Sequence, residues 1–233
     1  MSKNQLTFEI RKVWAIAKLM KIEQSFTGPV ALQASEEFKR LATSPDVSYE
    51  ELYLEGLQSS QYNIILKDYS FLQFGSGNAD EVRYAFYPNP FIGASQAAIT
   101  ELAEMQEYVE EGIIGVDDFL HKASELRFPQ HPPLIRYEYS VEQYAELRHP
   151  CSHLHLGFHS ENRLPLKRYM SAWAFSLLIF KLFYLENWVN SKNFKTDDKD
   201  LTLDDVYANA RQECRILSDA EFSKNEERHF HLF

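Results

Sequence analysis

Residues 62–87, YNIILKDYSFLQFGSGNADEVRYAFY, decide the fold class of this chain. Both ends of the stretch are rich in aromatic and β-branched residues, which are typical of strands. Its centre, GSGNAD at residues 75–80, consists of residues that favour turns. We therefore predict a β-hairpin with a six-residue loop, and with it an antiparallel sheet.

Three more segments alternate between apolar and polar residues in the way that strands do. LIRYEYS at residues 134–140 and SHLHLGF at residues 152–158 lie downstream of the hairpin, and RHFHLF occupies residues 228–233. Together with the hairpin, these segments predict a mostly antiparallel sheet of about five strands.

The remaining segments show helical patterning, in which apolar residues recur every three or four positions. An apolar stripe predicts a helix over residues 5–20, and residues 171–190 are apolar on all sides, which is typical of an enclosed helix. The other predicted helices are a weak one at 33–42 with a short helical turn after it, one from Pro90 to Gly112, one at 116–126 and one at 201–214. Residues 190–200 are polar and predict a solvated loop.

The fold class that follows is α+β, with a mostly antiparallel sheet packed by helices. We expect a single domain, in which residues 1–60 form an N-terminal helical segment and residues 61–233 form the α+β core.

The composition places the chain among globular proteins. At 233 residues and 45% hydrophobic content, it is long enough for one substantial core. Two cysteines are too few for a disulfide scaffold, and the first residues lack the apolar core of a signal peptide. The most apolar run is about 14 residues long, short of the roughly 20 that span a bilayer. We therefore expect a cytoplasmic protein that does not associate with membranes.

The net charge of −10 argues against broad, non-specific binding of nucleic acid, which depends on neutralising phosphates. Residues 148–168 reverse this sign locally, because four lysine and arginine side chains there stand against one glutamate. Nucleic acid therefore stays a candidate partner through this segment.

The stretch RHPCSHLHLGFHSENRLP, residues 148–165, holds four of the eight histidines. In an extended strand, His153, His155 and His159 share one face, and the leucine side chains point to the core. His153 and His155 are close enough to share a ligand, whereas His159 lies about 20 Å from His153.

One interpretation of this strand is a metal site. Two histidines on one strand can bind a divalent metal when further ligands come from elsewhere. If the C-terminal segment pairs beside the histidine strand, His229 and His231 supply two more imidazoles, and Asp68 and Glu138 are candidate carboxylate ligands. No other cofactor is indicated.

A second interpretation is phosphodiester chemistry without a metal. Imidazole can take a proton from a hydroxyl and return one to a leaving oxygen, and arginine stabilises charge on phosphate. His153, His155 and Arg163 supply these groups, with Tyr169 as a helper. The third interpretation is structural: the histidines are polar residues on a sheet face.

Two weaker patterns occur in the same stretch. RHPCSH, Arg148 to His153, resembles the arginine–histidine motif of HEPN-type ribonucleases, but Pro150 opposes the helix that this motif requires. Cys151 has the histidine neighbours that a nucleophilic thiol needs, although a buried structural cysteine is the more common case.

From HPCSHLHLGF onward, the chain resembles a bacterial family known only as a domain of unknown function. The family pattern is an HP-x-SHLH-[IL]-G strand, then R-[IL]-P, then a long apolar helix. The residues that match it are His149, Pro150, Ser152, His153, His155, Gly157, Arg163 and Pro165. The resemblance implies a bacterial protein from a mobile-element or defence setting, and it implies no established activity.

Two functions remain open from the sequence. The first is an effector nuclease or phosphodiesterase of a bacterial defence or mobile-element system, acting on RNA or a nucleotide through His153, His155 and Arg163. The second is a non-catalytic subunit that binds a partner protein, encoded in the same operon, in a multi-component complex. The local basic segment at residues 148–168 favours the first function, and the net charge of −10 of the whole chain favours the second.

Overall fold

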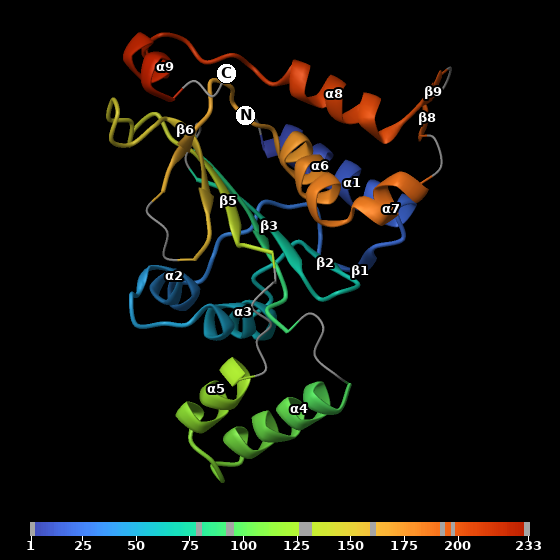
Figure 1. Ribbon diagram of the computed structural model, residues 1–233, viewed down its shortest axis with the longest axis vertical. Helices are drawn as coiled ribbons and strands as arrows, with labels where there is room; N and C mark the ends of the chain where they lie inside the picture. Colours follow the sequence, from blue (N-terminus) through green and yellow to red (C-terminus); the bar gives the residue numbers. More distant parts are fainter. Residues whose placement is uncertain are drawn as a thin grey trace.

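The fold is described from a computed structural model of the chain (Figure 1). It describes residues 3–77, 81–91, 96–125, 132–158, 162–191, 194–196 and 199–230. The predicted α+β class is confirmed, because helices pack against an antiparallel sheet.

Within these residues, seven strands form one sheet in which every strand pairs with the next one along the chain. The strands are β1 (Glu23–Phe26), β2 (Ile64–Leu66), β3 (Phe71–Ser76), β4 (Val82–Tyr87), β5 (Ile135–Tyr139), β6 (Ser152–Leu156) and β7 (Leu164–Pro165). All six pairings are antiparallel, so the sheet is a meander.

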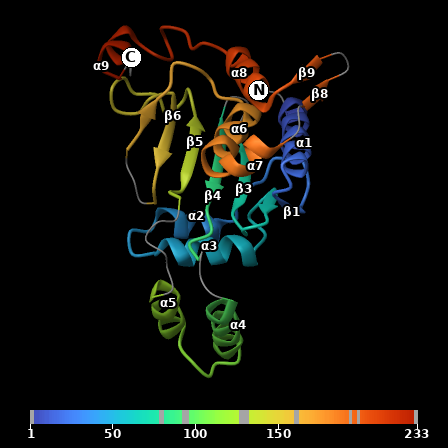
Figure 2. The ribbon, with the colours of Figure 1, turned by 45° about the vertical axis from the view of Figure 1, so that its right-hand side comes forward.

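Helices cover the two faces of this sheet unequally. The described helices are α1 (Lys3–Leu19), α2 (Glu36–Thr43), α3 (Tyr49–Gln58), α4 (Gln96–Glu110), α5 (Val116–Glu125), α6 (Ala172–Phe183), α7 (Leu185–Asn190), α8 (Leu203–Glu213) and α9 (Lys224–Phe230). The helices α1, α6 and α8 share a large apolar core with one face, and α2 and α3 share a smaller core with the other. The pair α4 and α5 projects away from the sheet in both views (Figures 1 and 2).

Alternation along the strands creates the two cores. Tyr84 and Tyr137 point into the larger core, where their rings stack 5.5 Å apart between centroids. Phe71 and Tyr87 point into the smaller one, where their rings stack at 4.6 Å. Each buried side chain of this size contributes roughly 1.5–3 kcal/mol of hydrophobic free energy.

The strand prediction for residues 62–87 needs one correction, because residues 62–74 form two strands. The Asp68 side chain accepts the backbone N–H of Ser70 at 3.0 Å, and Tyr69 takes a positive φ of 63°. This Asx turn ends β2 and begins β3 without a glycine or proline to mark it.

Three other predicted segments differ from the structure. Residues 190–200, expected as a loop, include the paired strands β8 (Phe194–Thr196) and β9 (Lys199–Leu201). The helix over 171–190 is interrupted at Tyr184. The expected C-terminal strand is wrong, because residues up to Phe230 belong to α9; residues 231–233 lie outside the described part.

The expected helical segment 1–60 also contributes to the sheet. It contains α1, α2 and α3, and it also contains β1, which pairs with β2. The sheet therefore begins within this segment.

Candidate functional site

A row of charged and histidine side chains crosses three strands on the less covered face of the sheet. The register places Arg83 of β4 opposite Glu138 of β5, and Glu138 opposite His153 of β6. Two residues further along the same face of the strands, Arg136 lies opposite His155. Directly opposed residues in an antiparallel sheet have Cβ atoms about 4.5–5.5 Å apart, so their side chains meet.

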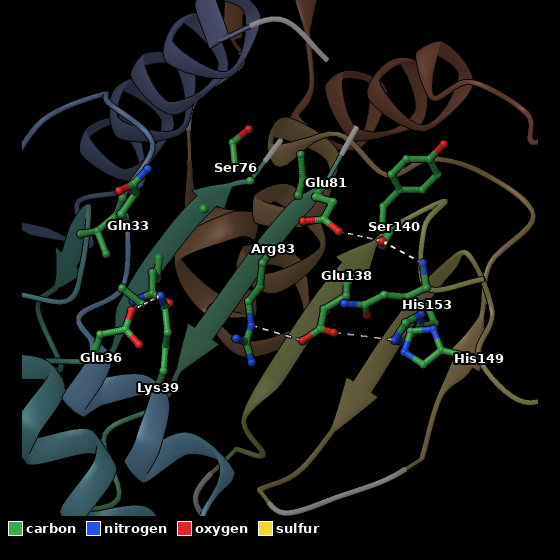
Figure 3. Close-up of a pocket in the computed structure, with 18 residues that line it drawn as sticks. Gln33, Glu36, Lys39, Ser76, Glu81, Arg83, Glu138, Ser140, His149 and His153 are labelled. Carbon is green, nitrogen blue, oxygen red and sulfur yellow. Dashed lines mark hydrogen bonds and ion pairs between the residues drawn. The ribbon is translucent and has the colours of Figure 1, made fainter. Parts of the chain in front are cut away.

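Of these side chains, Arg83, Glu138 and His153 lie at one end of a cavity of about 550 Å³ (Figure 3). The floor of the cavity is the sheet, and its far wall is the start of α2 with Glu36 and Lys39. Arg83, Glu138, His149 and His153 line the near end.

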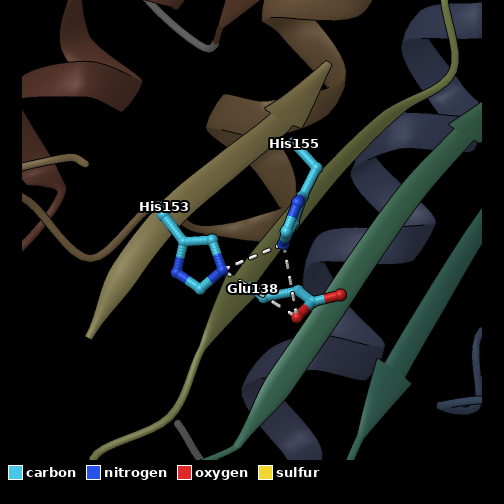
Figure 4. A group of neighbouring side chains, drawn as sticks. All are labelled: Glu138, His153 and His155. Carbon is cyan, nitrogen blue, oxygen red and sulfur yellow. Dashed lines mark hydrogen bonds and ion pairs between the residues drawn. The ribbon is translucent and has the colours of Figure 1, made fainter. Parts of the chain in front are cut away.

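Glu138, His153 and His155 converge on one point (Figure 4). The two Nε2 atoms of the histidines lie 3.1 Å apart. Glu138 Oε2 lies 3.9 Å from Nε2 of His153 and 3.8 Å from Nε2 of His155. The His153 side chain is 1% exposed and the His155 side chain 6%, so the histidine face is buried rather than open.

The main chain fixes the orientation of the His153 ring. Nδ1 of His153 lies 2.7 Å from the carbonyl oxygen of Pro150, and because a carbonyl only accepts, Nδ1 carries the proton. Burial lowers the pKa of His153 to about 4, and His155 adds to this lowering, so the ring is neutral near pH 7. Its Nε2 atom therefore keeps a free lone pair that faces His155 and Glu138.

Glu138 is ionised in this setting. Burial by itself raises the pKa of Glu138, but the hydrogen bond from His155 and the charges of Arg83 and Arg136 outweigh it and hold the pKa well below its usual range. Arg83 Nε lies 3.2 Å from Glu138 Oε1, on the side of the carboxylate away from the histidines.

Three arginines lie near the cluster, of which Arg83 lines the cavity and Arg136 and Arg163 do not. Burial and the charge of Arg83 lower the pKa of Arg136, and the Nε atom of Arg136 is buried without a hydrogen-bond partner among the described residues. Arg163 directly precedes β7, and its charge lowers the pKa of both Arg136 and His149. Arg83 and Arg136 thus act on the carboxylate of Glu138, whereas Arg163 acts on Arg136 and His149.

The loop between β5 and β6 holds His149 over the cluster. The rings of His149 and His153 pack edge to face, 5.0 Å apart between centroids. Burial first, and then the charge of Arg163, lower the pKa of His149. Helix α9 secures this loop, because Tyr144 of the loop donates a hydrogen bond to Glu226 at 2.8 Å.

The structure brings together the central residues that the sequence singled out. His153 and His155 share one site with Glu138, which the sequence offered only as one of two carboxylates. Arg83, Arg136 and His149 were missed as members of the site. Alternation along residues 134–140 did place Arg136 and Glu138 together on one face, which was the available signal.

Other candidates lie elsewhere. His229 sits on the exposed side of α9, where its Nδ1 pairs with the backbone oxygen of Asn225 at 2.8 Å, and it is outside the converging group. Asp68 accepts a hydrogen bond from Tyr184 in a distant turn. Tyr169 packs with Tyr84 in the core on the opposite face. His159 and His231 lie outside the described residues.

Two minor interpretations gain no support from the geometry. Arg148 lies exposed in a turn and His153 on a strand, so the HEPN-like spacing has no helix. Cys151 is buried, and burial raises the pKa of its thiol to about 11, which keeps it protonated at neutral pH.

The basic segment 148–168 is divided between the faces of the sheet. Lys167 forms an ion pair with Glu227, and Arg168 donates to the backbone oxygen of Cys214 at 2.7 Å. Both line a second, mostly apolar cavity of about 750 Å³ against α6 and α8, on the Leu154 side of β6. Arg163 is the basic residue of this segment whose charge acts at the histidine cluster.

Among the described residues, no helix combines the length and the apolar character that crossing a membrane requires. Comparison with curated proteins and with solved structures finds no match. The chain belongs to the DUF2290 family, described as an uncharacterized conserved protein, whose sequence pattern matches residues 16–233.

Proposed function

We propose that this DUF2290 member is a nuclease or phosphodiesterase that acts on RNA or on a nucleotide, with the cavity of Figure 3 as its active site. The family carries no assigned activity, so the proposal rests on the chemistry of the site. The observation that carries it is the Glu138–His153–His155 group, in which both histidines are buried, bordered by arginines at the end of a cavity.

The arginines supply the reason for a phosphate substrate. Immediately around the cluster, Arg83, Arg136 and Arg163 exceed the one negative charge of Glu138, although Glu36 and Glu81 also line the cavity and the chain as a whole carries −10. Such a local excess attracts an anion, and guanidinium groups match the oxygens of phosphate with paired N–H donors. The unpaired Nε of Arg136 is a donor that a phosphate oxygen would satisfy.

The cluster supplies the reason for bond cleavage. An oxygen of the attacking hydroxyl, from water or from the 2′-hydroxyl of RNA, bonds to phosphorus while the bond from phosphorus to the leaving oxygen breaks. The attacking group gives its proton to the cluster, and the leaving oxygen takes up a proton from the solvent. The Nε2 lone pair of His153 is the acceptor that the geometry offers, and Arg163 and Arg136 stabilise the charge on the phosphoryl oxygens.

The test is hydrolysis by the purified protein of single-stranded RNA, of cyclic nucleotides and of bis(p-nitrophenyl) phosphate. We expect the double variant His153→Ala/His155→Ala to lose about 10²–10⁴-fold in rate, as removal of general acid–base groups does. Arg163→Ala should lose about 10²-fold. His229→Ala is the matched control, because this histidine lies on α9 away from the cluster.

The comparison is valid when the variants keep the circular dichroism spectrum and melting temperature of the parent. A folded double variant that cleaves as fast as the parent would refute the proposal. The setting in a bacterial defence or mobile-element system is part of the proposal and rests on the family resemblance; the genes that adjoin this one test it.

A second candidate is a non-catalytic subunit that binds a protein partner from the same operon. It is favoured by the projecting pair α4 and α5, in which residues 96–125 carry eight Asp and Glu against one Lys. Tyr108, Ile113 and Val116 are exposed apolar side chains on this pair. Replacing these three with Ser should abolish co-purification with the product of an adjacent gene and leave hydrolysis unchanged.

A further inference from the structure

We propose that Glu138, His153 and His155 bind one divalent transition-metal ion, with zinc as the best match to the ligand set. The inference deepens the proposed function, because it names the cofactor of the same site, and its catalytic meaning rests on that function. The binding itself is argued from the three side chains alone (Figure 4).

The geometry is close to that of a three-ligand zinc site. Bonds from zinc to nitrogen or oxygen are about 2.0–2.2 Å long, so two ligands of one tetrahedral ion lie about 3.3–3.5 Å apart. The separations of 3.1, 3.8 and 3.9 Å among the three atoms fall on either side of this value. Side-chain shifts of about half an ångström bring all three onto one ion.

The ligand atoms are also in suitable protonation states. His153 donates Nδ1–H to the carbonyl of Pro150, the outer partner that fixes the tautomer of metal-binding histidines. Its Nε2 lone pair therefore points into the cluster, and the carboxylate of Glu138 is ionised.

The three side chains already converge without an ion. The two imidazole nitrogens lie 3.1 Å apart and share a hydrogen bond beside the carboxylate of Glu138. An ion at the shared point would take the place of the proton between the two nitrogens. Two histidines and one carboxylate are typical of catalytic zinc and of non-haem iron, whose remaining coordination positions stay open.

When bound, the ion would lower the pKa of a water molecule in an open position and so supply a hydroxide near neutral pH. Because Nε2 of His153 would then hold the ion, the ion-bound hydroxide would replace that lone pair in activating the attacking oxygen, and the chain would act by holding the ligands and by orienting the substrate. Arg83, Arg136 and Arg163 would bind the phosphate, and His149, packed on His153, would lie at the mouth of the site.

The experiment is calorimetric titration of the chelator-treated full chain with ZnCl₂, together with elemental analysis of the protein as purified. We expect one zinc ion per chain and a zinc-dependent rise in melting temperature. Glu138→Gln, which keeps the side-chain volume, and His155→Gln should each lower the affinity at least tenfold. His229→Ala, the matched control, should bind as the parent does.

Equal zinc affinity in the parent, Glu138→Gln and His155→Gln would overturn the proposal, as would the absence of binding by the folded parent to Zn²⁺, Mn²⁺, Fe²⁺ and Ni²⁺. The two proposals fail separately. Hydrolysis by the protein in excess chelator, together with no zinc binding by the folded parent, would keep the phosphodiesterase and remove the ion, whereas ligand-dependent zinc binding without hydrolysis would keep the ion and remove the phosphodiesterase.

Discussion

At the scale of single residues, one partly buried carboxylate away from the site is held by several hydrogen bonds. This carboxylate is Glu221, whose side chain is 13% exposed. Its carboxylate accepts hydrogen bonds from Arg215 at 2.7 and 2.8 Å, from the Tyr139 hydroxyl at 2.6 Å and from the backbone N–H of Ser218 at 3.0 Å. The hydrogen bonds from Arg215, and then those from Tyr139 and Ser218, hold the pKa of Glu221 well below its usual range against the opposing effect of burial.

This pKa makes stability depend on pH at the acid end. Since the folded-state pKa is depressed, the stabilisation is present above the unfolded pKa of about 4.3 and is lost as the pH falls below it. We predict that Glu221→Gln lowers the free energy of unfolding by about 2 kcal/mol at pH 7, and that the difference shrinks towards pH 3. Urea denaturation at both pH values measures it.

The matched control is Glu36→Gln, which removes an exposed ion pair with Lys39. Exposed pairs contribute about 0–1 kcal/mol, so this variant should stay close to the parent at both pH values. An equal loss in both variants would mean that the contacts of Glu221 stabilise no more than a surface pair.

At the scale of elements, close packing of α3 on the sheet depends on one residue without a side chain. A Cβ atom on Gly56 would lie 2.6 Å from the Phe71 ring and 3.2 Å from the Phe38 ring. We predict that Gly56→Ala destabilises the protein by about 1–3 kcal/mol through overpacking, although alanine gains about 1 kcal/mol in helix propensity. Gln58→Ala, at an exposed position of the same helix, should be neutral or slightly stabilising in the same melting experiment.

Periodicity predicted most of these elements. The stripes over 5–20, 116–126 and 201–214 became α1, α5 and α8, because an amphipathic helix shows its buried face directly in the sequence. The turn at Asp68 was missed because it is made by a side-chain hydrogen bond, without glycine or proline. The helix α9 was missed because RHFHLF alternates between polar and apolar residues. The residue that anchors this helix is Glu226, which precedes RHFHLF and accepts hydrogen bonds from the backbone of Ser223 and from Tyr144.

The site was predictable in part, because alternation within a strand shows which side chains share a face. It puts His153 and His155 together on one face of their strand and Arg136 and Glu138 together on one face of theirs, but it does not show how the two strands pair. Register decides which residues of β5 face β6, and register depends on the ten residues between Ser140 and Cys151. Burial of the histidine face depends on the loop that carries Pro150 and His149, which no local pattern indicates.

At the scale of the whole molecule, a carboxylate near the N-terminus joins two helices that are far apart in sequence. Glu9 of α1 is buried, and its Oε2 accepts the backbone N–H of Trp173 at the start of α6, at 3.2 Å. The interaction satisfies a helix N–H and places negative charge at the positive end of the helix dipole.

We predict that Glu9→Ala lowers the free energy of unfolding by about 1–3 kcal/mol. Glu9→Gln, which keeps an acceptor and removes the charge, should lose about half as much, and this graded pair separates the hydrogen bond from the charge. Chemical denaturation measures both. Equal and negligible losses in the two variants would show that α1 docks through its apolar side chains alone.

The contact between Glu9 and Trp173 also has a consequence for synthesis of the chain on the ribosome, because 164 residues separate the two. Each hairpin of the meander can form soon after its second strand emerges, since its partner is its neighbour in the chain. At typical rates, the ribosome needs roughly 10–30 seconds to synthesise the chain from Glu9 to Trp173. During that interval α1 and the first strands have no α6 to cover the larger apolar face, so we expect chaperones to bind the nascent chain before the domain is complete.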